Sequence, residues 1–150
     1  MNKTPKLRMY RYRIYPSRKQ QDVLTNQFSI CKTIYNKLLR LNIISYKNSK
    51  KTFRKFDFNK FVSGRYPTLH SQVVQNISDR LYKAMQNFFR RMKNKACKKK
   101  GFPRFKSKLK SITFPQSGFK LLYNKKLFAS KIGAIPISLH RLPEGKIKTL

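Results

Sequence analysis

Two long stretches of the chain carry apolar residues at intervals of three or four positions. This spacing predicts two amphipathic helices, one from residue 17 to about 46 and one over about 71–95. Ser17 and Gln20 have the spacing of a capping box, which marks the start of the first helix. The apolar positions are Leu24, Phe28, Cys31, Ile34/Tyr35, Leu38 and Leu41 in the first stretch, and Val74, Ile77, Leu81, Met85, Phe88 and Met92 in the second.

Shorter apolar segments with strand-like texture lie before and after the two helices. Residues 7–15 alternate, with Tyr10, Tyr12 and Ile14 predicted on one face and Arg11 and Arg13 on the other. Five segments follow the helices, separated by Gly, Pro and Asn, as is typical of a small antiparallel sheet or barrel. These segments are 111–115, 118–123, 126–130, 134–140 and 145–150.

The order of elements is therefore one strand, two main helices and several strands. We predict an α+β fold in which a small antiparallel β-barrel carries a helical insertion after its first strand. Between the main helices, Asp57 is placed to cap a short helix that stops at Gly64. The last apolar segment has no turn after it, which suggests that relatives of this chain continue beyond residue 150.

Charge changes this picture more than any motif does. The chain has 37 Lys and Arg against four acidic residues, a formal net charge of +33. A compact domain with this charge repels itself, so a polyanionic partner must neutralise part of it. Nucleic acid fits best, because each neutralised phosphate releases counterions. A Lys-rich solvated surface is the plain alternative, but such surfaces normally mix both signs.

Membranes and disulfide or zinc chemistry are less consistent with the sequence. No run approaches the roughly 18 apolar residues that a membrane span needs, and the N-terminus lacks the apolar stretch of a signal peptide. Cys31 and Cys97 lie far apart and outside any C-x-x-C pair, so we expect no zinc site and no disulfide framework. This usage fits a reducing cytoplasm.

The acidic residues are too few and too scattered for metal-dependent cleavage, which needs clustered carboxylates. Each has a structural interpretation instead. Asp22 follows the first cap, Asp57 is a cap, Asp79 faces Arg80 and Lys83, and Glu144 lies in a turn. His70 and His140 lack metal-ligand spacing and a nucleophile partner. We predict no catalytic residue, no metal and no cofactor.

Candidate binding residues are the cations that no acid offsets. The segment 98–108 mixes cations with Phe102 and Phe105, which either stack on unpaired bases or, as the more common use of aromatics, anchor the segment on the core. Arg11 and Arg13 either bind phosphate or guanine or protect a strand edge; Arg90 and Arg91 either complement a helix dipole or bind nucleic acid. The full candidate set is Arg11, Arg13, Arg80, Lys83, Arg90, Arg91, Lys98, Lys99, Lys100, Arg104, Lys106 and Lys108.

Several segments, in this order, carry a family resemblance across nearly all 150 residues. They are 12–16 (YRIYP), 71–75 (SQVVQ), 87–91 (NFFRR), 101–106 (GFPRFK), 131–133 (KIG), 139–141 (LHR) and 145–149 (GKIKT). The chain resembles the N-terminal region of TnpB (OrfB) proteins of bacterial and archaeal insertion sequences, often described as a helix-turn-helix transposase domain.

The resemblance implies an RNA-guided DNA endonuclease family whose N-terminal region is a β-barrel wedge domain with an inserted helical recognition domain. On this chain the wedge would be residues 1–16 and 97–150 and the insertion 17–96. Arg11, Arg13 and 98–108 would belong to the wedge and its junctions, and Arg80, Lys83, Arg90 and Arg91 to the recognition helix. The implied partners are transposon-derived RNA and DNA.

Full members of the family continue into a RuvC-like nuclease domain with three carboxylates and usually a four-cysteine zinc ribbon, and neither is in this sequence. We therefore expect a truncated transposon protein that binds nucleic acid without cutting it. Two alternatives stay open. The chain is one half of a split nuclease with a separate RuvC-containing polypeptide, or it is a structural RNA-binding protein of ribosomal type.

Overall fold

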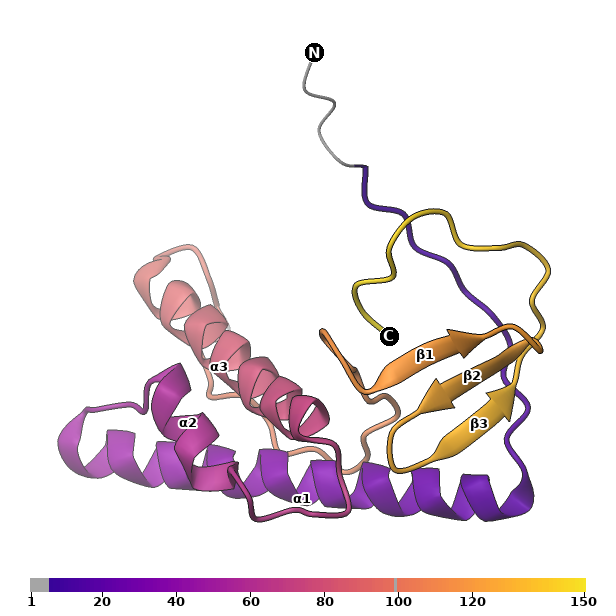
Figure 1. Cartoon of the computed structure of the whole chain (residues 1–150). Coiled ribbons are helices and arrows are strands. Elements are labelled where there is room, and N and C mark those ends of the chain that lie inside the picture. Colours follow the sequence, from indigo (N-terminus) through magenta and orange to yellow (C-terminus); the bar gives the residue numbers. More distant parts are fainter. Residues whose placement is uncertain (1–5, 99) are drawn as a thin grey trace.

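Three helices and then three short strands make up the fold. The computed structural model describes residues 6–98 and 100–150. The elements are α1 (Arg18–Ser49), α2 (Lys55–Val62), α3 (Ser71–Lys93), β1 (Phe119–Leu122), β2 (Lys126–Ala129) and β3 (Gly133–Pro136). In Figure 1, α1 forms the base of the molecule, with α2 and α3 toward its C-terminal half and the sheet toward its N-terminal half. The predicted α+β class is confirmed.

The long helix α1 begins where the sequence predicts. The Ser17 hydroxyl accepts a hydrogen bond from the Gln20 backbone N–H (3.3 Å), and the Gln20 side chain accepts one from the Ser17 N–H (2.9 Å). This reciprocal capping box satisfies two backbone donors that a helix start leaves without partners. The helix ends at Ser49, and its C-cap Lys50 has a positive φ of 55°, which directs the chain out of the helix.

The helix α3 is capped by His70, where three segments of the chain meet. The His70 Nδ1 accepts a hydrogen bond from the Gln72 backbone N–H at 3.2 Å. The same ring lies 5.8 Å from the ring of Phe114. Gly118 approaches it so closely that a Cβ there would lie 2.8 Å from His70 Cε1. His70 therefore joins the start of α3 to the segment that leads into β1.

The sequence predicts the short helix α2 around Asp57. The Asp57 carboxylate accepts a hydrogen bond from the backbone N–H of Arg54, three residues earlier, at 2.9 Å. Asp57 thus stabilises the first turn, where a negative charge also favours the helix dipole. The helix stops at Val62, and Gly64 has a φ of +68°, a backbone conformation that glycine adopts without strain.

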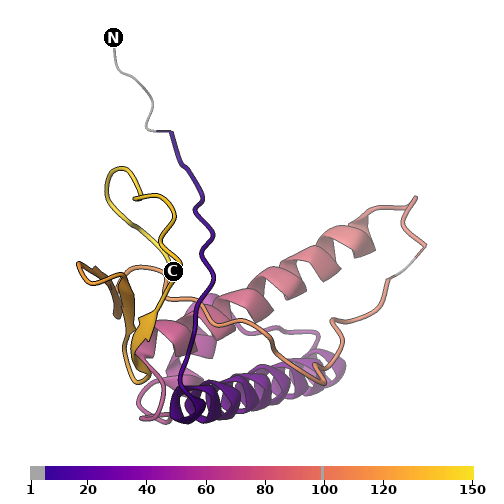
Figure 2. The ribbon, with the colours of Figure 1, turned by 90° about the vertical axis from the view of Figure 1, so that its right-hand side faces the viewer.

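One hydrophobic core joins the helices to the sheet. Its fully buried side chains include Ile34 of α1, Phe58 of α2 and Ile77 of α3, and the same cluster continues through Phe114 and Ala129. From the predicted apolar stripes, Cys31, Ile34, Tyr35 and Leu38 of α1 and Val74, Ile77, Leu81, Met85 and Phe88 of α3 belong to this core. Leu24, Phe28 and Leu41 are half-buried outside it. Met92 has 43% of its surface exposed. It lies in the last turn of α3, at the end that diverges from α1 in Figure 2.

The sheet is open, so the predicted β-barrel is wrong. The strands pair antiparallel in the order β1-β2-β3, with Phe119 opposite Ala129 and Leu127 opposite Ile135. Three strands of four residues each are too few and too short to close on themselves. The segments 111–115 and 145–150 form no strand in the described structure; Phe114 and Leu150 exchange two backbone hydrogen bonds, of 2.8 and 3.1 Å.

The predicted first strand, residues 7–15, is also wrong, and the strands therefore follow the helices. Its described residues make one isolated antiparallel bridge, Ile14 with Ile137. The flanking hydrogen bonds join Tyr15 N–H to the Pro136 carbonyl (2.8 Å) and Ser138 N–H to the Arg13 carbonyl (2.9 Å). Pairing cannot extend far, because Pro16 and Pro136 have no N–H to donate. Side chains hold the earlier residues instead, through the Arg8–Glu144 ion pair.

Side chains from α1 fasten the sheet to the helices. The Gln20 side-chain amide donates to the Ala134 carbonyl of β3 at 2.8 Å. The buried Gln27 amide donates to the carbonyls of Thr68 and Lys131, each at 3.4 Å. The first half of α1 is therefore bound to β3 and to the turn before it.

Within the described chain, no helix has the length and apolar character needed to cross a bilayer.

Candidate nucleic-acid interface

Local partners account for most of the acidic residues. Asp57 caps α2, Glu144 pairs with Arg8, and Asp79 lies 3.3 Å from the Lys55 ammonium without hydrogen-bond geometry. The sequence predicted that Asp79 faces Arg80 and Lys83, whereas in the structure its carboxylate lies next to Lys55 of α2. Among residues 6–98 and 100–150, no three His, Cys, Asp or Glu side chains are grouped to hold a metal ion. The acidic residues thus form no common site.

The segment after α3 follows a path fixed by three contacts. The Arg91 guanidinium donates to the Gly101 carbonyl at 3.2 Å. The ring of Phe102 stacks on Phe88 with centroids 4.6 Å apart and lies 5.5 Å from the ring of Tyr46. The Asn36 side chain of α1 then exchanges two hydrogen bonds with the backbone of Lys106. The segment is therefore bound to both α3 and α1.

This anchored segment exposes its cations. We call residues 98–108 the basic segment; Lys98, Lys100, Arg104, Lys106 and Lys108 are all exposed on it. Lys99 lies outside the described residues. The Lys106 ammonium lies 5.7 Å from the centre of the Tyr35 ring, within range of a cation–π contact.

The two Phe residues of the basic segment have different environments. Phe102 anchors the segment in the core, as the more common interpretation of the sequence predicts. Phe105 does not, since 55% of its surface is exposed. The sequence could not separate the two, because both lie within three positions of each other in the same cation-rich segment.

The candidate cations of α3 fall into two groups. Lys83 and Arg90 are exposed, and the Arg90 guanidinium donates to the Asn87 side chain of the preceding turn at 3.1 Å. Arg80 is half-buried and donates to the Ser111 carbonyl (3.0 Å) and the Thr113 hydroxyl (2.8 Å). Burial lowers the pKa of the Arg80 guanidinium from its usual value. Arg80 and Arg91 thus hold the following chain against α3.

Arg11 and Arg13 are exposed but lie apart from the basic segment. Their stretch of chain runs beside the sheet near the start of α1, whereas α3 ends toward the opposite side (Figures 1 and 2). The Arg13 guanidinium carbon lies 5.7 Å from the centre of the Tyr15 ring. The structure therefore distributes the predicted residues over two regions rather than one continuous site.

Arg141 joins the N-terminal region, although the sequence did not single it out. Its guanidinium carbon lies 5.0 Å from the centre of the Tyr10 ring, and its carbonyl accepts a hydrogen bond from the Tyr12 hydroxyl. Tyr10 and Arg141 border an open pocket of about 440 Å³, which Arg8, Met9, Leu142 and Glu144 also line. The sequence marks Arg141 only as part of segment 139–141, and its contact with Tyr10 was not predictable because it joins residues more than a hundred positions apart.

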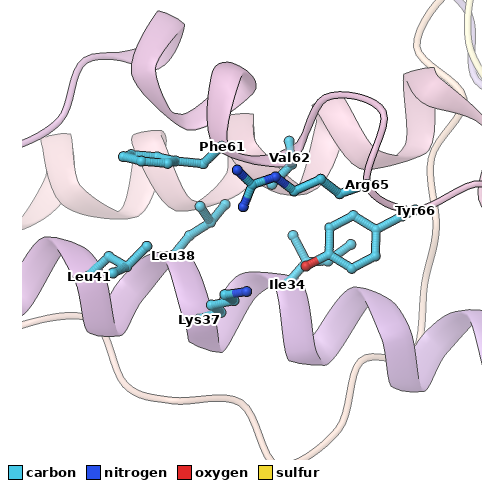
Figure 3. A pocket seen from close by; sticks show the side chains of 8 residues that line it. All are labelled: Ile34, Lys37, Leu38, Leu41, Phe61, Val62, Arg65 and Tyr66. Carbon is cyan, nitrogen blue, oxygen red and sulfur yellow. The ribbon is translucent and has the colours of Figure 1, made fainter.

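An apolar cleft between α1 and the end of α2 is too small for a ligand. Its volume is about 20 Å³, roughly that of a single water molecule. Figure 3 shows Lys37 of α1 and Arg65, which follows α2, on opposite sides of it. The lining residues are Ile34, Lys37, Leu38, Leu41, Phe61, Val62, Arg65 and Tyr66. The cleft is therefore no candidate for a ligand site.

Comparison with known families bears on the first third of the chain. Residues 1–51 match the family model HTH_OrfB_IS605, a helix-turn-helix domain. We call this matched segment the OrfB domain. The resemblance to the N-terminal region of OrfB/TnpB transposon proteins is thereby confirmed over residues 1–51. None of the curated proteins matches the chain.

The match supports DNA binding, because helix-turn-helix domains place a helix against DNA. The described part of the OrfB domain contains one helix, α1, rather than two helices joined by a short turn. The partner helices α2 and α3 come after residue 51. The helix that packs against α1, α3, thus lies outside the matched range.

Proposed function

We propose that this chain is the nucleic-acid-binding portion of a TnpB-like transposon protein, associated with DNA transposition, and that it holds guide RNA, DNA or both without cutting them. One observation carries the proposal. An anchored segment exposes five cations, and the sequence has no acidic residue between Asp79 and Glu144 to offset them. Such a surface attracts phosphates by counterion release.

The proposed contacts lie in two regions. The first is the basic segment with Lys83 and Arg90 of α3, and by sequence Lys99 belongs to it. The second is Arg11 with Arg13. Arg80 and Arg91 support the first region by positioning the chain that carries it, and each keeps guanidinium donors for a phosphate. In this proposal residues 1–16 and 97–150 correspond to the wedge part of TnpB-type proteins, and 17–96 to the recognition part.

Binding without cleavage follows from the carboxylates. Two-metal hydrolysis of phosphodiesters needs several carboxylates that converge on the metal ions, and here Asp57, Asp79 and Glu144 each have a separate local contact. Cleavage would therefore require carboxylates from outside these 150 residues, and in the split-nuclease alternative a separate RuvC-containing polypeptide supplies them. Sequencing the DNA beside the gene for a frame rich in acidic residues and C-x-x-C pairs distinguishes that alternative.

The test is a titration of the purified chain with labelled RNA and DNA at several salt concentrations. If six to ten phosphates are contacted, the association constant should fall about 10³- to 10⁵-fold between roughly 50 and 200 mM salt. An affinity that does not change with salt, or no binding in dilute buffer, would overturn the proposal. Metal-dependent cleavage by the chain alone would contradict the proposed absence of activity.

A further inference from the structure

Phe105 is a large apolar side chain that the fold leaves in solvent. More than half of its surface, 55%, is exposed, and its ring makes no ring–ring or cation–π contact within the described residues. Phe102, three positions earlier, is packed against Phe88 and Tyr46. The fold therefore uses one ring of the basic segment for anchoring and keeps the other accessible.

The backbone that carries Phe105 is held in place. The next residue, Lys106, donates its N–H to Asn36 Oδ1 at 2.8 Å and accepts at its carbonyl from Asn36 Nδ2 at 2.9 Å. On the other side, Phe102 and Gly101 are fixed to α3. An anchored backbone presents the ring at a defined place, which lowers the entropy lost when a flat partner binds.

The charges around Phe105 are cationic and have no acidic neighbours. Arg104 and Lys106 flank it directly and Lys108 follows, all exposed. Phe56 of α2 provides an internal comparison, because it is even more exposed, at 76%. There, however, the next residue is Asp57, and the preceding Lys55 is paired with Asp79. An aromatic ring between unpaired cations is the arrangement by which proteins bind single-stranded nucleic acid.

We propose that Phe105 stacks on an unpaired base of a single strand while Arg104, Lys106 and Lys108 contact the phosphates on either side. This inference rests on the proposed function and deepens it, since it names single-stranded nucleic acid as the ligand of the basic segment. In a duplex the faces of the bases are covered by their neighbours. Phe105 therefore contributes to the binding of single strands and not to that of duplexes.

The first test measures the affinity of Phe105 variants for a single-stranded 15-mer of thymidine or uridine and for a duplex of equal length. Phe105→Ala should weaken single-strand binding about 5- to 150-fold, as expected for one stacked base, and change duplex binding less than about twofold. Phe105→Leu should behave like Phe105→Ala, because it keeps apolar bulk without a π face. Phe105→Tyr should retain wild-type affinity.

The second test uses fluorescence, because the chain contains no tryptophan. In Phe105→Trp the indole should be quenched when the single strand binds, since a stacked base quenches its emission. Phe56→Trp is the matched control, an exposed ring whose emission should change little on binding. Circular dichroism of each variant confirms that the fold is kept.

Three results would overturn the inference. These are equal losses for single strand and duplex in Phe105→Ala, full affinity in Phe105→Leu, and an unquenched indole in Phe105→Trp. Each leaves the proposed function standing as long as binding of the wild-type chain falls steeply with salt. If the wild-type chain binds neither strand type in dilute buffer, both the proposed function and this inference fail.

Discussion

The side-chain amide of Asn36 and the backbone of Lys106 form a closed pair of hydrogen bonds across 70 positions of sequence. Nδ2 donates to the Lys106 carbonyl at 2.9 Å, and Oδ1 accepts from the Lys106 N–H at 2.8 Å. Asn36 lies near the middle of α1, whereas Lys106 lies in the basic segment beyond α3. This contact sets where the exposed cations and Phe105 lie relative to the helices.

Asn36→Ala should therefore release the basic segment from α1. A typical internal hydrogen bond contributes about 1 kcal/mol, so we expect a loss of about 1–2 kcal/mol in the free energy of unfolding, measured by urea denaturation. Single-strand affinity should fall as well, because the cations are no longer pre-positioned. Asn26→Ala is the control, since Asn26 is an exposed residue of the same helix. An effect no larger than that of Asn26→Ala would show that the Asn36 contact does not hold the segment.

A side chain at Gly118 should destabilise the fold, because this residue lies close to the ring of His70. A methyl group there would lie 2.8–2.9 Å from three ring atoms of His70, and the φ of Gly118 is +91°. We expect Gly118→Ala to lower the free energy of unfolding by about 2–3 kcal/mol, because strain and the displacement of a helix cap combine. The melting temperature and the helical circular dichroism signal should both decrease.

Gly145→Ala separates the two causes. Gly145 also has a positive φ, +78°, but nothing lies within 4 Å of its added methyl group. It reports the backbone strain alone, about 1 kcal/mol. If both variants lose the same stability, the contact between Gly118 and His70 contributes nothing measurable.

Local patterns predicted the helices well. The capping box of Ser17 and Gln20 and the apolar spacing located α1 to within a few residues, because both signals depend on neighbours one turn away. Asp57 revealed the start of α2 for the same reason. The favoured interpretation, that both Phe residues of the basic segment anchor it on the core, is right for Phe102 and wrong for Phe105.

Features that depend on distant contacts were not predictable in this way. The alternation of residues 7–15 indicated a strand, yet a strand forms only where a partner offers hydrogen bonds, and Pro136 limits pairing to the neighbourhood of Ile14. The barrel failed for a related reason, because Phe114 and Leu150 pair without forming strands. In the candidate interface, the residue types were predictable from the sequence. The hydrogen bonds of Arg80 to Ser111 and Thr113 and those of Asn36 to Lys106 were not.

The thiol of Cys31 should stay protonated, and therefore react slowly with alkylating reagents, up to unusually high pH. Burial raises its pKa to about 11, and the positive charge of Arg80 opposes this only in part. In a Cys97→Ala background Cys31 is the single thiol. We expect its alkylation by iodoacetamide at pH 8 to be at least about tenfold slower in the folded chain than in urea, because the folded thiol is neutral.

The same shift makes stability depend on pH in a defined direction. The folded pKa lies above the unfolded value near 9, so the thiol favours folding below pH 9, and this contribution is lost as pH rises through 11. Between pH 9 and 10 the chain should lose up to about 1 kcal/mol more than Cys31→Ala does. Parallel pH curves for the two proteins would contradict the raised pKa.

Arg80 and Lys83 lie three positions apart on α3, and their substitution should have opposite consequences. Arg80→Gln removes hydrogen bonds to Ser111 and Thr113, and the remaining amide cannot span both. We expect it to lower the free energy of unfolding by about 1–2 kcal/mol, after allowance for the exposed half of the side chain. Lys83 is exposed, so Lys83→Gln should change stability by less than about 0.5 kcal/mol.

If Lys83 contacts a phosphate, Lys83→Gln should affect nucleic-acid binding although it hardly affects stability. Loss of one phosphate contact reduces the slope of log affinity against log salt by about 0.9 on a duplex or about 0.7 on a single strand. Lys83→Gln should show this change, and Lys83→Arg should restore the slope because it keeps the charge. Arg80→Lys keeps the charge but not the planar guanidinium, so its stability should remain low while its salt slope stays near that of the wild type. A salt slope unchanged in Lys83→Gln would remove this face of α3 from the proposed interface and leave the basic segment to bind alone.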